Sequence, residues 1–204
     1  MKDNTTPPPN HQGGALARGA RVTLRYPRFE DQGEYVELVR VSRELHRPWE
    51  PRRPEGAPPA ASQETFTTWL MGADDPRTER MLLCKSADGA IVGRFHLNEI
   101  VRGAFHSAYL SYCVGAPFAG QGLMREWMEP ILEHAFNAAG LHRVGANIQP
   151  TNAPSIALAK GAGFRLEGYS ERYLKIAGEW ADHERWAMTV EDWRARASAI
   201  DPSS

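Results

Sequence analysis

The sequence predicts a mixed α/β fold in which a central sheet of about seven strands is flanked by helices. Two observations support this prediction. Segments that alternate apolar and polar residues, as strands do, recur between segments with helical spacing. The chain has 204 residues, of which 42% are hydrophobic and 24% charged, which is typical of one globular domain with a buried core. We expect this domain to span residues 20–193.

The two ends of the chain lack such patterns. The opening segment MKDNTTPPPNHQGG is rich in Pro, Asn, Thr and Gly and has no apolar stretch, so it does not read as a secretory signal. We therefore predict a disordered tail over residues 1–19. A second tail is expected over residues 194–204, after a last half-helix that starts near Asp192.

The first half of the domain begins with the alternating strand RVTLRYP. A helix follows from Asp31, a residue type that favours the N-cap position. The segment HRPWEPRRPEGAPPA holds five prolines in fifteen residues, which predicts an irregular exposed loop. A second helix is expected from Ser62 to Met71.

The second half alternates strands and helices around a few turn residues. Strands are predicted in MLLCKSADGAIVGRFHLNEI on both sides of Asp88 and Gly89, then in SAYLSYCV and HRVGANIQ. A long helix over residues 120–139 is stopped by Gly140, with a kink expected at Pro130. A short helix over residues 152–161 precedes a hairpin formed by FRLEGYSERYLKI and WADHERWAMTV.

Composition narrows the functional classes. The formal net charge of −1 gives no general attraction to nucleic acid or to an anionic membrane, and no apolar run approaches the roughly 20 residues that span a bilayer. Cys84 and Cys113 lack metal-ligand spacing and are interpreted as reduced core thiols. The histidines show no paired spacing, so no metal is expected. We expect a cytoplasmic protein, either a monomer or a homodimer.

The segment SYCVGAPFAGQGLMREW has the order strand, glycine-rich loop, helix. Glycines allow main-chain amides to face one point, and the first amides of a helix add unpaired donors and a positive dipole end. This order suits a cradle for a diphosphate. A plain strand-to-helix turn is the alternative, because isolated glycine motifs are weak signals.

The segment ANIQPTNAPSIALAKGAGF repeats the order strand, turn, helix. Asn152 is predicted to cap the helix, and Ser155 lies in its first turn. Both residues have a purely structural alternative, as a cap and as an ordinary first-turn residue.

Together and in this order, these segments resemble the GNAT superfamily of N-acetyltransferases over about residues 20–193. NEIVRGAFHSAYLSYCVG, FAGQGLM, HRVGAN, GFRLEGY, GEWADH and LHRPWEP are similar to segments of the RimJ-type subgroup, the ribosomal-protein alanine N-acetyltransferases. The resemblance implies acetyl-CoA as co-substrate. It also implies that the glycine loop binds the diphosphate and that the pantetheine arm enters a splay between the strands ending at Val114 and Gln149. The implied cofactor contacts are Tyr112, Cys113, Val114, Ala119, Gly120, Gln121, Gly122, Leu123, Met124, Asn152 and Ser155.

Two positions depart from the family pattern. The usual Gln/Arg-x-x-Gly-x-Gly/Ala motif has Ala119 first and Met124 last, so only Gly122 keeps its place. The tyrosine that many members use as an acid is replaced by Ala159. The resemblance therefore implies Ser155 as proton donor to the leaving thiolate, with Tyr112 and Tyr173 as less favoured alternatives.

The general base is left open among five candidates by residue type: Glu50, Glu99, Glu167, Asp182 and His183. An α-amine reduces the need for a strong base, because exposing its neutral form at pH 7 costs about 1 kcal/mol, against roughly 4 or more for lysine. The resemblance points to a protein or peptide N-terminus as acceptor, such as that of a ribosomal protein. Trp49, Glu50 and Trp180 are the predicted acceptor contacts, with Glu50 as the favoured base.

Two other functions stay open. One is acetylation of a small amine of the aminoglycoside type, because related folds serve many acceptors. The other is a non-catalytic acyl-CoA-binding or ribosome-assembly factor, which the changes at Ala119 and Ala159 keep under consideration.

Overall fold

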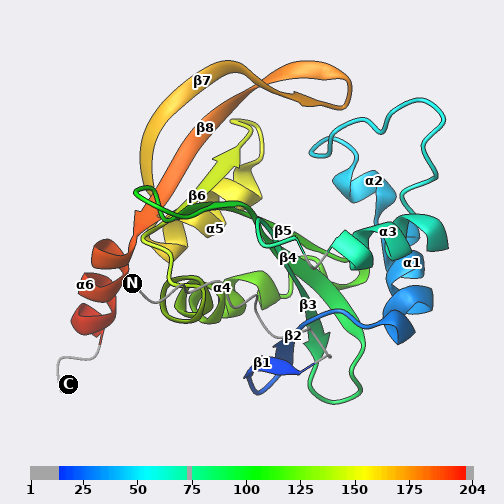
Figure 1. The fold of residues 1–204 in the computed structure, drawn as a ribbon, viewed down its shortest axis with the longest axis horizontal. Helices are drawn as coiled ribbons and strands as arrows, with labels where there is room; N and C mark the ends of the chain where they lie inside the picture. The colour runs from blue at the N-terminus through cyan, green and yellow to red at the C-terminus, as the bar shows by residue number, and fades with distance from the viewer. Residues whose placement is uncertain (1–13, 73–74, 201–204) are drawn as a thin grey trace.

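The computed structural model describes residues 14–72 and 75–200, and these form one sheet with helices on both faces (Figure 1). The sheet has eight strands in the order β1-β2-β3-β4-β5-β6-β8-β7. All neighbours are antiparallel except β5 and β6. The strands are β1 (Ala15–Arg18), β2 (Val22–Arg25), β3 (Glu79–Lys85), β4 (Ile91–Val101), β5 (Ser107–Val114), β6 (Arg143–Ile148), β7 (Arg165–Ile176) and β8 (Glu179–Thr189).

The helices divide between the two faces. The larger apolar cluster packs α4 and α5 against one face, and the smaller cluster packs α1 and α3 against the other. The helices are α1 (Gln32–Val41), α2 (Arg43–His46), α3 (Gln63–Met71), α4 (Leu123–Glu133), α5 (Ala153–Ala162) and α6 (Val190–Ile200). Shorter turns are η1 (Phe29–Asp31), η3 (Ala116–Phe118) and the π-helical η4 (His134–Ala138).

The larger core is centred on α4. Trp127, Ile131 and Leu132 of this helix are almost fully buried against Phe95 and Leu97 of β4. Each fully buried large apolar side chain contributes about 1.5–3 kcal/mol relative to its exposed form. This helix therefore holds fixed the loop from which it starts, where the glycine motif lies.

The long helix differs from its predicted course at both ends. It begins at Leu123 rather than residue 120, because Gly120 and Gly122 both have φ of +75° and cannot join a right-handed helix. Pro130 lies inside α4, and the helix widens into the π-helical η4 from His134. A proline lacks the N–H donor that a regular helix would use, which accounts for irregularity near this position.

Asp31 was predicted to cap α1, but its side chain makes no capping bond to that helix. Its carboxylate instead accepts hydrogen bonds from the main-chain N–H of Arg28 at 2.7 Å and from the guanidinium of Arg25 at 2.6 and 2.7 Å. Both members of the Arg25–Asp31 pair are buried. Removing one partner of such a pair costs about 3–5 kcal/mol, because the other charge is left uncompensated.

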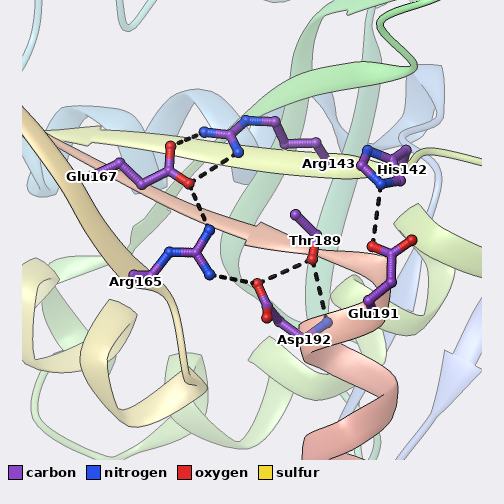
Figure 2. A network of polar contacts seen from close by, with 7 residues as sticks. All are labelled: His142, Arg143, Arg165, Glu167, Thr189, Glu191 and Asp192. Atoms are coloured by element: carbon purple, nitrogen blue, oxygen red, sulfur yellow. Dashed lines mark hydrogen bonds and ion pairs between the residues drawn. The ribbon is translucent and has the colours of Figure 1, made fainter.

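The β7–β8 hairpin extends beyond the rest of the sheet and arches toward the loop that follows α2 (Figure 1). At its base a polar network joins β6, β7, β8 and α6 (Figure 2). Glu167 binds both Arg143 and Arg165, and Arg165 also contacts Asp192 of α6 at 2.9 Å. These contacts hold the base of the hairpin in a fixed position relative to β6 and α6.

The fold class is as predicted, with corrections at the ends. The sheet has eight strands rather than about seven, because Ala15–Arg18 form β1 inside the segment expected to be a disordered tail. Antiparallel pairing with β2 orders this segment. The expected C-terminal tail is helical as far as Ile200, where α6 ends. Residues 1–13 and 201–204 lie outside the described residues.

Candidate active site

The only parallel neighbours in the sheet, β5 and β6, separate soon after they meet. They pair at three positions, from Ser107 opposite Arg143 to Tyr109 opposite Gly145. Beyond this point β5 continues to Val114 and β6 to Ile148 without pairing to each other. A Cβ on Gly145 would lie 3.0 Å from the Tyr109 ring, so glycine allows the two strands to meet where they do. The predicted splay is therefore present.

The glycine loop follows directly from the end of β5. An added Cβ at Gly120 or Gly122 would meet no atom within 4 Å, so the space beside these residues is open. The first main-chain hydrogen bond into α4 is donated by Glu126 to the oxygen of Gly122 at 3.1 Å. The N–H groups of the preceding helical positions have no partner within the helix and suit an anionic ligand.

The loop is held in place from outside by Arg21, in the turn between β1 and β2. Its guanidinium binds the carboxylate of Glu126 at 2.7 Å and the main-chain oxygen of Gln121 at 3.3 Å. The Gln121 side chain turns back to the oxygen of Pro117 at 3.0 Å. Gln121 thus shapes the loop, whereas sequence reasoning had placed it among the cofactor contacts.

The start of α5 lies beside the end of β5. Asn152 caps α5 as predicted, since its Oδ1 accepts a hydrogen bond from the main-chain N–H of Ser155 at 3.2 Å. Tyr112 donates from its hydroxyl to the main-chain oxygen of Ser155 at 3.3 Å. Burial raises the pKa of Tyr112 to about 12, so its phenol stays protonated at neutral pH. The serine and tyrosine considered as proton donors therefore lie side by side.

One cavity of about 960 Å³ is lined by the end of β5, the start of α5, the glycine loop and the loop after α2. Its wall includes all but two of the predicted site residues: Trp49, Glu50, Tyr112, Cys113, Val114, Ala119, Gly120, Gly122, Leu123, Met124, Asn152 and Ser155. Gln121 and Trp180 are not part of the wall. Trp180 lies at the start of β8 with 61% of its surface exposed.

The proline-rich loop closes one end of this cavity. Glu50 forms an ion pair with Arg94 of β4 at 3.0 Å, and Arg94 also donates to the hydroxyl of Tyr35 at 2.6 Å. The main-chain oxygen of Glu50 accepts from the N–H of Ala177, at the tip of the β7–β8 hairpin, at 3.0 Å. The loop and the hairpin tip are thus clasped together at the cavity's edge.

Of the five candidate bases, Glu50 alone belongs to the cavity wall. Glu167 is engaged in the network at the hairpin root (Figure 2). Asp182 accepts from Tyr169 and from the main-chain N–H of Arg172, both at 2.7 Å. His183 is buried, and its Nδ1 lies 3.0 Å from the main-chain oxygen of Ala181. Glu99 lies on β4 and is not part of the cavity wall.

Sequence reasoning did not single out Arg94, His96 and Trp69, which also line the cavity. His96 Nε2 and Trp69 Nε1 are buried and, within the described residues, have no hydrogen-bond partner. Burial and the positive charges of Arg94 and Arg80 hold the pKa of His96 well below 6.5, so this imidazole is neutral at pH 7. Period-two spacing places Arg94 and His96 on one face of β4, but it does not reveal that this face borders a cavity.

Within the residues that the structure describes, no group of three or more His, Cys, Asp or Glu side chains is placed to hold a metal ion. None of the helices over residues 14–72 and 75–200 combines the length and apolar character needed to cross a membrane. Cys84 is buried and Cys113 is partly buried, and neither forms a disulfide.

These features fit coenzyme A. The free amides and positive dipole end of α4 suit its diphosphate, and the open space beside Gly120 and Gly122 leaves room for it. The splay offers unpaired strand edges to the amide groups of a pantetheine arm. Residues of both motifs meet in one cavity, so the donor set and the space agree with such a ligand.

Comparison with known proteins gives the same result. The Acetyltransferase (GNAT) domain family matches residues 21–165. The [ribosomal protein uS5]-alanine N-acetyltransferase of Escherichia coli K12 is 30% identical over 184 residues, which covers 85% of this chain and 90% of that protein. The structure of Mycobacterium smegmatis RimJ in complex with CoA-disulfide superposes with a TM-score of 0.78 at 28% identity, covering 88% of this chain and 89% of that one.

Spermidine N-acetyltransferase from Vibrio cholerae, in complex with CoA and spermine, shares the fold with a TM-score of 0.72 at 20% identity. It covers 85% of this chain and 98% of its own. The family match spans most of the chain and includes the glycine loop, the splay and the start of α5. The chain belongs to the GNAT family and is an acetyl-CoA-dependent N-acetyltransferase.

Proposed function

We propose that this enzyme transfers the acetyl group of acetyl-CoA to the N-terminal α-amine of a protein or peptide, with a ribosomal protein as the model acceptor. One observation carries the proposal most strongly. A single cavity is lined by the glycine loop, the end of β5, the start of α5 and the proline-rich loop, and this last loop is hydrogen-bonded to the hairpin tip. The similarity to a ribosomal-protein alanine N-acetyltransferase over most of both chains supports this class of acceptor.

The proposed reaction is a direct transfer. The neutral amine attacks the thioester carbonyl, so that an N–C bond forms, the C–S bond breaks and the amine loses a proton. Ser155, at the start of α5 and on the cavity wall, donates a hydrogen bond and a proton to the departing thiolate, and the proton lost by the amine returns to the Ser155 oxygen through water. The Tyr112 hydroxyl, bound to the Ser155 main chain, holds this turn of α5 against β5.

Glu50 is the proposed partner of the incoming ammonium. It lies on the wall, and Arg94 fixes one of its carboxylate oxygens at 3.0 Å. An α-amine has an ordinary pKa near 7.7–8.0, so a substantial fraction is neutral at physiological pH. Glu50 or a water molecule beside it is therefore sufficient to take up the proton.

Release of free thiol from acetyl-CoA, followed with a panel of amines, tests this proposal. Peptides with a free N-terminus and a small first residue should be acetylated, and N-terminally blocked copies that contain lysine should not. Mass spectrometry should place the acetyl group on the α-nitrogen. Rapid turnover of spermidine or an aminoglycoside, with no turnover of any free-amine peptide, would instead favour a small-amine acetyltransferase. Absence of thiol release with every peptide of the panel would refute this class of acceptor.

A further inference from the structure

The cavity wall is rich in arginine and poor in carboxylate. Within the described lining, the only carboxylate is Glu50, and the guanidinium groups are those of Arg52, Arg53, Arg94 and Arg125. The wall thus carries more positive than negative charge, although the chain as a whole has a formal charge of −1. A surplus of one sign inside a cleft raises the local concentration of ligands of the opposite sign.

Two of these four arginines have an evident role. Arg94 is neutralised by Glu50 at 3.0 Å. Arg125 lies in the first turn of α4, beside the glycine loop that suits the diphosphate of coenzyme A. Arg52 and Arg53 are left, and neither forms an ion pair within residues 14–72 and 75–200.

These two arginines lie on the part of the cavity wall formed by the proline-rich loop, which is hydrogen-bonded to the hairpin tip. A Cβ on Gly178, at the hairpin tip, would lie 3.4 Å from Cδ of Arg52. Arg53 is fixed by its own loop, because Nε donates to the oxygen of Pro58 at 2.8 Å and Nη2 to Thr65 Oγ1 at 3.2 Å. Those bonds leave the Nη1 group of Arg53 unused.

We propose that Arg52 and Arg53 form a carboxylate subsite at the acceptor end of the cavity, which selects amines that carry a carboxylate nearby and rejects polyamines. This inference rests on the proposed function, since it refines the acceptor of the same site. Guanidinium groups bind carboxylates through paired, charge-assisted hydrogen bonds, which are stronger than neutral ones. A polyamine would bring further positive charge to two arginines that already lack a counterion.

Two chemical groups can supply this carboxylate. It can be the side chain of an acidic residue near the N-terminus of a peptide, or the α-carboxylate of a free amino acid. A peptide extends by at most about 3.3–3.6 Å per residue, so the position of the acidic residue that the enzyme prefers, second or third, measures how far the subsite lies from the reacting amine. The two sources differ in whether the α-carboxylate must be free.

Steady-state kinetics with matched acceptors separates these sources. The panel consists of C-terminally amidated peptides with alanine first and Glu, Gln or Lys second, together with free alanine, alaninamide and spermidine. If a side chain is bound, the Glu peptide should exceed the Lys peptide by about tenfold or more in kcat/KM. If an α-carboxylate is bound, free alanine should exceed alaninamide by a similar factor.

Variants test the residues. The double substitution Arg52→Gln with Arg53→Gln should remove most of the preference for the carboxylate-bearing acceptor and leave the KM for acetyl-CoA unchanged. The double substitution Arg52→Glu with Arg53→Glu reverses the charge of both side chains, so the enzyme should then prefer the Lys peptide to the Glu peptide. Arg47→Gln is the matched control, because Arg47 lies on the same loop, pairs with Glu44 at 3.4 Å and is outside the cavity wall.

Failure of this inference is distinguishable from failure of the proposed function. If acidic, neutral and basic peptides are acetylated equally, and the double variant changes none of them, the subsite is absent while the peptide acetyltransferase stands. If spermidine is the best acceptor and no peptide reacts, both are overturned. If the double variant raises the KM for acetyl-CoA and leaves acceptor preference intact, the two arginines serve the cofactor instead.

Discussion

His46 donates a hydrogen bond from Nε2 to the main-chain oxygen of Val114, across 2.8 Å. His46 is the last residue of α2 and Val114 the last of β5, so the bond joins the start of the proline-rich loop to the start of the glycine loop. Ser42 adds a second link, because its Oγ accepts from the main-chain N–H of Ala116 at 2.8 Å. The acceptor and cofactor ends of the cavity are thus physically joined.

His46→Ala should therefore affect both substrates. Loss of a single hydrogen bond of about 0.5–1.5 kcal/mol should raise the KM for acetyl-CoA by a factor of roughly two to ten, and the KM for the peptide should rise with it. His106→Ala is a matched control, since His106 lies 3.3 Å from the main-chain oxygen of Gly140, near the other end of β5. Equal KM values for wild type and His46→Ala would show that the hydrogen bond between His46 and Val114 does not contribute to the binding of either substrate.

Gly122→Val tests the diphosphate cradle. The side chain would project into the open space beside Gly122 and should weaken acetyl-CoA binding by well over tenfold. Valine is also strained at a φ of +75°, so Gly140→Val, at a φ of +63° outside the cavity, controls for strain. Calorimetry should show weakened binding for Gly122→Val and unchanged affinity for Gly140→Val. Equal affinity in both variants would refute the cradle.

Ser155→Ala and Tyr112→Phe separate the two hydroxyls near the end of β5. If Ser155 serves the thiolate, Ser155→Ala should lower kcat and kcat/KM together, because a transition-state interaction is lost. Tyr112→Phe removes only a bond to the Ser155 main chain, so a smaller effect is expected. Pre-steady-state measurement of thiol release isolates the chemical step. A large loss in Tyr112→Phe with wild-type rates in Ser155→Ala would reverse these roles.

His96 should make the fold sensitive to mild acid. Its pKa in the folded protein lies well below 6.5, whereas in the unfolded chain it is ordinary. Between the two values the unfolded state binds a proton that the folded state does not, so stability falls as the pH drops below about 6.5. His96→Gln should flatten the profile of Tm against pH between about 6.5 and 5. Parallel profiles for variant and wild type would contradict this prediction.

Trp49→Ala should act on the acceptor. Trp49 lines the cavity from the proline-rich loop, where prolines restrict the backbone and lower the cost of ordering it on binding. We expect the peptide KM to rise much more than the KM for acetyl-CoA. Trp180→Ala is a useful comparison, because Trp180 is exposed outside the wall and should change neither value. A loss of thermal stability in Trp49→Ala, with an unchanged peptide KM, would assign this tryptophan to packing.

Elements with strong periodicity could be predicted from the sequence almost to the residue. The strand SAYLSYCV is β5, the Ser62 cap starts α3, and the Asn152 cap starts α5. Strand β1 was missed because it has only four residues, none of them fully buried, and pairing with β2 rather than a local pattern orders them. Local propensity cannot reveal order that depends on a distant partner.

In the candidate site too, residues with a local sequence signal could be predicted and residues that depend on a distant partner could not. The glycine loop and the start of α5 carry local signals, and both reach the cavity. The ion pair between Glu50 and Arg94 joins positions 44 residues apart in the chain, so neither residue marks the other in the sequence. Trp180 is exposed outside the cavity wall, and its role as an acceptor contact stays a prediction.

The three-position pairing of β5 with β6 has a consequence for the protein's lifetime. The two halves of the sheet are joined there by a short seam, and the edges beyond it lack a neighbour. A ligand that fills the splay would form hydrogen bonds with the strand edges that face each other there. It would bind the folded protein and not the unfolded chain. By mass action, a ligand at 100 times its Kd stabilises the folded state by about 2.7 kcal/mol. Supply of coenzyme A would then govern both how fast the enzyme works and how long it resists proteolysis.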